Sequence, residues 1–146
     1  NIITSLALEA PVQEAFNIKL QAKYREIEAN EARFATYKTE DAEHLFVAFG
    51  SISRICESAV DIAREHGYKV GLLRPITLYP YPKQELDRLV PQVKSIMSVE
   101  LNAGQMVEDV RLVVNGRVPV SFYGRMGGMV PSPEEIFEAF VKSIKK

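Results

Sequence analysis

The chain has 146 residues, of which 47% are hydrophobic and 25% are charged, and its formal net charge is −1. This length suits one domain with a single core, and the near-neutral charge gives no general attraction to nucleic acid or to an anionic membrane surface. Cys56 is the only cysteine, so the chain cannot form an internal disulfide, and no cysteine or histidine spacing offers a metal site.

Targeting and membrane signals are also missing from the sequence. No stretch approaches the ~20 apolar residues that span a bilayer, and the first residues do not combine a basic segment with an apolar one. We therefore expect a protein of the reducing cytoplasm, with neither a membrane nor nucleic acid as its partner.

Residues 11–33 have the pattern of a long amphipathic helix. Pro11 suits the first turn of a helix, and apolar residues then recur every three or four positions. These apolar residues are Val12, Phe16, Leu20, Tyr24 and Ile27. Charged side chains crowd the other face, which predicts a helix that lies across another surface rather than within a core. Residues 33–38 alternate imperfectly and predict a short strand at the edge of a sheet.

Four further segments predict strands. Residues 44–50 form a continuous apolar run that ends in glycine, which is typical of a strand buried on both faces. The other three strands are predicted at residues 69–74, 93–101 and 118–124.

A helix is expected after each of these four strands. The first helix has Ser51 or Ser53 as its cap and ends at Gly67. The second covers residues 83–89, and the third follows a polar turn within residues 99–114.

The last helix begins after the glycine-rich turn "GRMGG". Ser132 is its expected cap and Pro133 its first residue. Glu134 and Glu135 in the first turn, with lysines near the end, suit the dipole of this helix.

Strands that alternate with helices require crossover connections, and crossovers of one hand build a parallel sheet that is covered on both sides. The sequence thus predicts an α/β fold of three layers. In such sheets a ligand usually lies beyond the carboxyl ends of the strands, where the strand order reverses. The candidates at these ends are Gly50, Ser51, Arg74, Glu100, Asn102, Gly124 and Arg125.

The first candidates have structural interpretations that the residues favour. Gly50 with Ser51 resembles half of a phosphate cradle, but the chain has neither GxGxxG nor GxxxxGK[ST], so a turn glycine and a capping serine are favoured. Arg74 could clamp an acidic group, yet we expect it to pair with a carboxylate such as Glu100.

The remaining candidates are interpreted in the same way. Glu100 could act as a general acid or base if burial raised its pKa, but no histidine or second acid stands beside it, so a hydrogen-bonded structural role is favoured. Gly124 with Arg125 could bind an anion, although glycine clusters are first of all turns. Cys56 is expected in the core and His66 at a helix end, as a cap. We therefore assign no catalytic residue and no metal site.

Four ordered segments carry a resemblance to a known family. They read "VAFGSISRICESAV", "KVGLLRPITLYPYPKQEL", "VELNAGQMVEDVRLVVNGRVPV" and "FYGRMGGMVPSPEEI". From about residue 11 to the end, the chain resembles the C-terminal region of the alpha subunit of 2-oxoacid:ferredoxin oxidoreductases, especially the 2-oxoisovalerate and 2-oxoglutarate types. It is more distantly similar to the last domain of transketolase. Met126 departs from the family pattern, in which a proline is expected.

The resemblance implies a fold and a division of the chain. The expected fold is transketolase C-terminal-like: three layers around a mostly parallel sheet of five strands, with residues 33–38 as the antiparallel member. Residues 1–32 would form a connector segment and long helix, and residues 33–146 the α/β domain. The helix would lie against a preceding domain.

The resemblance also implies an activity for the whole enzyme. The family decarboxylates a 2-oxoacid oxidatively, transfers the acyl group to coenzyme A and passes electrons through iron–sulfur clusters to ferredoxin, with thiamine diphosphate and magnesium as cofactors. This chain lacks the glycine–aspartate motif that supports magnesium and diphosphate, and one cysteine cannot hold a cluster. We therefore expect no cofactor in this chain and no activity from it alone, and the sequence does not identify which 2-oxoacid is used.

The implied partners are a preceding pyrimidine-binding domain of the same subunit, a beta subunit that binds thiamine diphosphate, an iron–sulfur subunit and, for the whole complex, ferredoxin. The resemblance places Glu100, Asn102 and Gln105 at a seam between domains or subunits, which favours a role in assembly over proton transfer. The alternative is a free-standing regulatory domain that binds a small molecule or nucleotide at the Gly50 and Gly124 turns.

Overall fold

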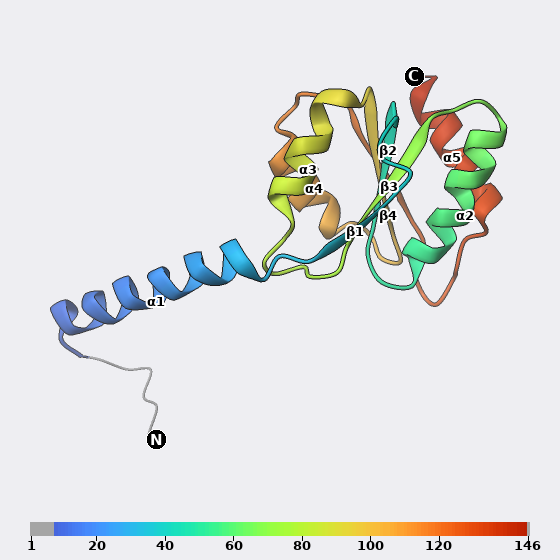
Figure 1. Cartoon of the computed structure of the whole chain (residues 1–146). Helices are drawn as coiled ribbons and strands as arrows, with labels where there is room; N and C mark the ends of the chain where they lie inside the picture. The colour runs from blue at the N-terminus through green and yellow to red at the C-terminus, as the bar shows by residue number, and fades with distance from the viewer. Residues whose placement is uncertain (1–7, 146) are drawn as a thin grey trace.

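A five-stranded sheet forms the centre of the computed structural model, which describes residues 8–145 (Figure 1). The strands lie in the order β1-β3-β2-β4-β5. Their bounds are Phe34–Tyr37 for β1, His44–Ala48 for β2, Val70–Pro75 for β3, Ser95–Glu100 for β4 and Val120–Gly124 for β5. The strands β2 to β5 run parallel, and β1 pairs antiparallel with β3. The predicted mostly parallel sheet with an antiparallel edge strand is confirmed.

Helices cover both faces of this sheet, which confirms the three predicted layers (Figure 1). The helices are α1 (Ala10–Asn30), α2 (Ile52–Glu65), α3 (Lys83–Leu89), α4 (Met106–Val114) and α5 (Pro133–Ile144), with a short 3₁₀ turn η1 at Val90–Gln92. The helices α2 and α5 pack together on one face, and α3 and α4 pack on the other.

The core lies in two clusters because successive side chains of a strand point to opposite faces. In β2, Phe46 and Ala48 pack with α2 and α5, whereas Leu45 and Val47 pack against α3 and α4. This explains the continuous apolar run of that strand. Cys56 is fully buried in the first cluster, as predicted.

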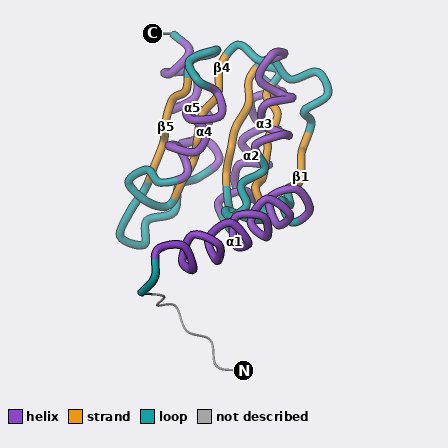
Figure 2. The backbone as a smooth tube through the Cα atoms, turned by 90° about the vertical axis from the view of Figure 1, so that its left-hand side faces the viewer, coloured by secondary structure: helices purple, strands orange, loops and turns teal. Residues whose placement is uncertain are grey.

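The first helix is unlike the others, because α1 contains no buried residue. Val12 and Phe16 are 54% and 49% exposed. The helix ends at Asn30, three residues earlier than predicted, and the chain then enters the sheet at β1. Figure 2 shows α1 crossing below one end of the strands.

The helix ends test the predicted caps. Ser132 and Glu135 form a capping box at the start of α5, and Nδ1 of His66 lies 2.8 Å from the Ile62 carbonyl at the end of α2, so both predictions are confirmed. The prediction that Ser51 or Ser53 caps α2 is confirmed in position only: Ser51 is the N-cap residue, but its side chain forms no capping hydrogen bond. Ser51 already has helical backbone angles and makes no capping bond, because a cap requires extended backbone there, while the Ser53 hydroxyl donates to the Gly50 carbonyl at 2.6 Å.

Candidate functional site

The strand order reverses between β2 and β4. From β2 the chain crosses to β3 on one side, and from β3 it crosses back over β2 to reach β4 on the other side. A cavity of about 390 Å³ lies at the carboxyl ends of β2 and β4. It brings together five of the candidates predicted from the sequence, which are Gly50, Ser51, Glu100, Asn102 and Gln105.

Glu100 is buried at the end of β4, where it is only 4% exposed. Its carboxylate accepts hydrogen bonds from the backbone N–H groups of Gln105, Met106 and Val107 at 2.9 to 3.1 Å and from the Ser98 hydroxyl at 3.0 Å. The predicted hydrogen-bonded structural role is confirmed.

The same contacts decide the charge of Glu100. Burial raises the pKa of this carboxyl, but the hydrogen bonds from three backbone N–H groups outweigh burial and hold the pKa below its usual value. A general acid at neutral pH needs a raised pKa. Glu100 is therefore an ionised cap rather than a proton donor.

This cap also fills the place where an anion would bind. The N-terminus of a helix attracts phosphate through its free N–H groups, and in α4 the Glu100 carboxylate accepts from those groups. The neighbouring Gly104 N–H donates to Oδ1 of Asn102 at 2.7 Å. The polar groups of this turn thus bond to one another, so the turn offers an anion no free N–H groups from Gly104 to Val107.

The predicted pairing of Arg74 with Glu100 is wrong. Arg74 lies on β3 and Glu100 on β4, and β2 stands between these strands. The Glu100 oxygens are already bonded to α4. Among the described residues, nothing accepts a hydrogen bond from the buried Nε of Arg74.

The remaining candidates, Gly124 and Arg125, form a turn rather than an anion site. Gly124 lies opposite Glu100 in the sheet, and an added Cβ would overlap the Asn102 carbonyl oxygen, so this position requires glycine. The Arg125 guanidinium pairs with the Glu135 carboxylate at 3.0 Å. The charge of Arg125 is thus balanced within the chain.

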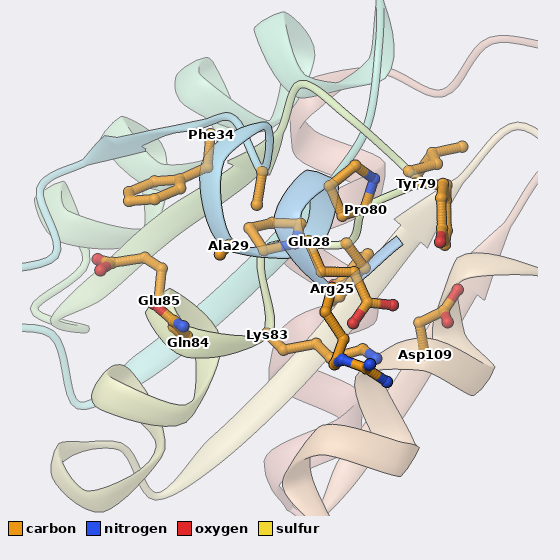
Figure 3. A pocket seen from close by; sticks show the side chains of 14 residues that line it. Arg25, Glu28, Ala29, Phe34, Tyr79, Pro80, Lys83, Gln84, Glu85 and Asp109 are labelled. Carbon is orange, nitrogen blue, oxygen red and sulfur yellow. The ribbon is translucent and has the colours of Figure 1, made fainter. Parts of the chain in front are cut away.

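A second cavity, of about 420 Å³, was not predicted from the sequence. Figure 3 shows side chains from α1, from the loop after β3 and from α4 around it. Leu78 and Asp109 line both this cavity and the one at the strand-order reversal. Tyr81 also lines the second cavity, and its buried hydroxyl has no partner among the described residues. The only signal in the sequence is the repeated Tyr-Pro of residues 79–82.

Groups that could carry redox or nucleophilic chemistry are sparse. Across residues 8–145, no three His, Cys, Asp or Glu side chains gather closely enough to hold a metal ion. Burial raises the pKa of the Cys56 thiol to about 12, which suppresses the reactive thiolate. In the same residues, no helix is long and apolar enough to cross a membrane.

These observations define a class of protein, a transketolase C-terminal-like α/β domain. At the carboxyl ends of its strands, which we call the rim, most of the polar groups described above bond to other groups of the same chain. A solved structure of similar fold is the 2-oxoglutarate:ferredoxin oxidoreductase from Magnetococcus marinus with 2-oxoglutarate, coenzyme A and succinyl-CoA bound, with a TM-score of 0.81 and 21% identity over 94% of this chain and 24% of that chain. A split-gene transketolase, described as an inactive beta4 tetramer, matches with a TM-score of 0.65 and 15% identity, covering 77% of this chain and 41% of that chain. At such identities the likeness shows the fold.

The sequence identifies the family. The family described as pyruvate:ferredoxin oxidoreductase core domain II matches residues 42–136. The chain belongs to this family, and is a domain of a 2-oxoacid:ferredoxin oxidoreductase subunit, as the resemblance implied.

Two relatives illustrate the match. The VorB subunit of ketoisovalerate oxidoreductase from Methanothermobacter marburgensis is 46% identical over 128 residues, which are 88% of this chain and 36% of that protein. The KorA subunit of 2-oxoglutarate synthase from Methanothermobacter thermautotrophicus is 35% identical over 104 residues, which are 71% of this chain and 28% of that protein. The chain thus spans about a third of the length of the relatives that it matches.

Proposed function

We propose that this chain is the accessory C-terminal domain of the alpha subunit of a 2-oxoisovalerate or 2-oxoglutarate:ferredoxin oxidoreductase of the cytoplasm. Its role is to pack on the catalytic domains and stabilise the subunit assembly during thiamine diphosphate-dependent decarboxylation to acyl-CoA. The observation that carries this proposal is the 46% identity to a ketoisovalerate oxidoreductase subunit over 88% of the chain.

The geometry of the rim supports a structural role for this domain. The Glu100 carboxylate serves as a helix cap, and Arg125 is paired with Glu135. Polar groups that are committed to such bonds hold a turn rigid, and a rigid rim suits docking against a neighbouring domain. We propose that Glu100 and Arg125 belong to an interface with a neighbouring domain or subunit. The other candidates for this interface are Gly50, Ser51, Arg74, Asn102, Gln105 and Gly124.

The cofactors of such an enzyme do not fit the residues of this chain. The first turn of α4 is filled by Glu100, so it offers no cradle for a diphosphate. A single buried cysteine cannot ligate an iron–sulfur cluster. The iron–sulfur clusters therefore belong to other parts of the enzyme, and the proposal assigns thiamine diphosphate, magnesium and coenzyme A to those parts as well.

The proposed partners are the other parts of the enzyme, which would hold these cofactors. Residues 1–32 connect the α/β domain of residues 33–146 to a preceding domain of the same subunit. A thiamine diphosphate-binding beta subunit and an iron–sulfur subunit complete the complex, and ferredoxin accepts its electrons.

An assay of the whole enzyme tests this function. The complete subunit that carries this sequence is purified with its partner subunits, and coenzyme A-dependent reduction of ferredoxin is measured with branched-chain, aromatic and dicarboxylic 2-oxoacids. Turnover is expected with a branched-chain oxoacid or with 2-oxoglutarate, and none from the 146-residue chain supplied with thiamine diphosphate and magnesium. Turnover by this chain alone, or a complex inactive on every oxoacid, would refute the proposal.

A further inference from the structure

The two ends of the sheet differ in chemistry. Six of the residues that follow the parallel strands at their carboxyl ends are apolar and between 38% and 62% exposed. We call these residues the carboxyl-edge surface: Phe49, Ile76, Leu78, Tyr79, Leu101 and Met126. At the opposite end, Glu43 pairs with Lys69 and Lys94. Exposed apolar residues that gather at one end indicate a contact site.

Two polar atoms at the same edge need a partner. Within residues 8–145, Nε of Arg74 and the hydroxyl of Tyr81 are the buried side-chain polar atoms without a hydrogen bond. Arg74 is the second-to-last residue of β3, and Tyr81 lies in the loop that follows this strand. Buried polar groups in folded proteins almost always have partners. Arg74 is only partly buried, so a neighbouring surface can reach the open part of its guanidinium, whereas the Tyr81 hydroxyl is enclosed by this chain.

The edge is also hollowed, which suits protruding side chains of a partner. The cavities of about 390 and 420 Å³ meet at Leu78 and Asp109. The helix α1 borders the second cavity through Arg25 and Glu28, and it runs along the same end of the strands (Figure 2). The carboxyl-edge surface, the two cavities and the helix α1 therefore form one continuous surface.

We infer that the carboxyl-edge surface is covered by a folded domain of the same oxidoreductase subunit, one that lies outside these 146 residues and presents an apolar face and a carboxylate that pairs with Arg74. This inference rests on the proposed function. The identity of the occupant is argued from length, since the chain accounts for 36% of a related subunit, and from α1, which leaves the sheet at this edge.

Site-specific thiol labelling of the whole subunit tests the covering. Tyr79→Cys and Lys142→Cys are compared, because Tyr79 is 62% exposed and the Lys142 side chain 77% exposed in this chain. Mass spectrometry identifies the labelled peptides. We expect Tyr79→Cys to react at least roughly tenfold more slowly than Lys142→Cys, because a docked surface opens only transiently. Met126→Cys repeats the test should Tyr79→Cys fail to fold.

The outcomes separate the possible occupants. Protection of Tyr79→Cys in the subunit purified alone supports the inference. Equal rates at the two positions, protection that appears only when partner subunits are added, or protection that depends on subunit concentration would each overturn it. Turnover by the wild-type complex reports separately on the proposed function, so the two proposals can fail independently.

Arg74→Met tests the pairing. In the Tyr79→Cys background, we expect Arg74→Met to raise the labelling rate roughly tenfold, as expected when an arginine anchor of an interface is lost. Arg88→Met is the matched control, because Arg88 pairs with Glu85 on the surface of α3. An unchanged labelling rate in Arg74→Met would overturn the pairing with a carboxylate.

Discussion

The carboxylate of Glu100, at the end of β4, accepts a hydrogen bond from the backbone N–H of Val107 in the first turn of α4 at 2.9 Å. This bond joins a strand to the helix that follows it across a turn of five residues. Because the same carboxylate also binds the N–H groups of Gln105 and Met106, it stabilises the junction rather than performing chemistry.

Removal of this carboxylate should destabilise the fold. In Glu100→Ala the N–H groups at the start of α4 lose their acceptor in a buried place, and we expect a loss of about 2–4 kcal/mol in the free energy of unfolding. Urea titration measures it. Glu108→Ala, on the exposed side of α4, is the control and should cost less than about 1 kcal/mol. Equal losses in the two variants would contradict the capping role.

The stabilisation by Glu100 should depend on pH. Its pKa is lower in the folded state than in the unfolded state, where a glutamate titrates near about 4.3. A lowered folded pKa gives stability that is present above the unfolded pKa and lost as the pH falls through the folded pKa. The difference in unfolding free energy between wild type and Glu100→Gln should therefore shrink below about pH 4. A difference that stays constant from neutral pH into acid would argue against an ionised Glu100.

Gly124 should not tolerate a side chain. A Cβ at this position would overlap the Asn102 carbonyl oxygen and the Phe122 ring, and we expect Gly124→Ala to cost about 1–3 kcal/mol, as overpacking does. The control is Gly116→Ala, where φ is +73° but the space is open, so only about 1 kcal/mol of backbone strain is expected. Thermal unfolding compares the two. A Gly116→Ala variant less stable than Gly124→Ala would contradict the close approach.

Deletion of residues 1–32 tests the division of the chain. Because α1 contains no buried residue, we expect residues 33–146 to keep a cooperative unfolding transition, with a change in stability of no more than about 1 kcal/mol. Circular dichroism and urea titration provide the measurement. Loss of cooperative unfolding would show that α1 belongs to the core of the domain.

Cys56 should be inert in the folded chain. Its thiol is fully buried and its pKa is raised to about 12, so the thiolate at pH 8 is about one part in ten thousand. We expect a thiol reagent to label Cys56 only when denaturant unfolds the chain. In a Cys56→Ala background, Leu112→Cys is the positive control, because Leu112 is 72% exposed. Rapid labelling of Cys56 without denaturant would contradict its place in the core.

Local patterns of the sequence were enough to predict the elements and the class of fold. The continuous apolar run before Gly50 is needed because β2 contacts a helical layer on each face. The Ser132 cap with its glutamates could likewise be predicted, because capping depends on residues only three positions apart. The sequence also predicted the position of Ser51 at the start of α2, but its capping bond is absent because the backbone angles of Ser51 are helical.

Only the tertiary structure decided which side chains meet at the rim. In the order of the strands, β2 lies between Arg74 and Glu100. The turn after β4 brings the Glu100 carboxylate to the start of α4, where its oxygens accept hydrogen bonds from backbone N–H groups. The unpartnered Tyr81 hydroxyl depends in the same way on where the loop after β3 packs. Periodicity depends on residues that are near one another in the sequence, so it determines helices, strands and buried faces. Pairing between strand ends depends on residues that are far apart in the chain. These residues come together only when the strands take their order in the sheet.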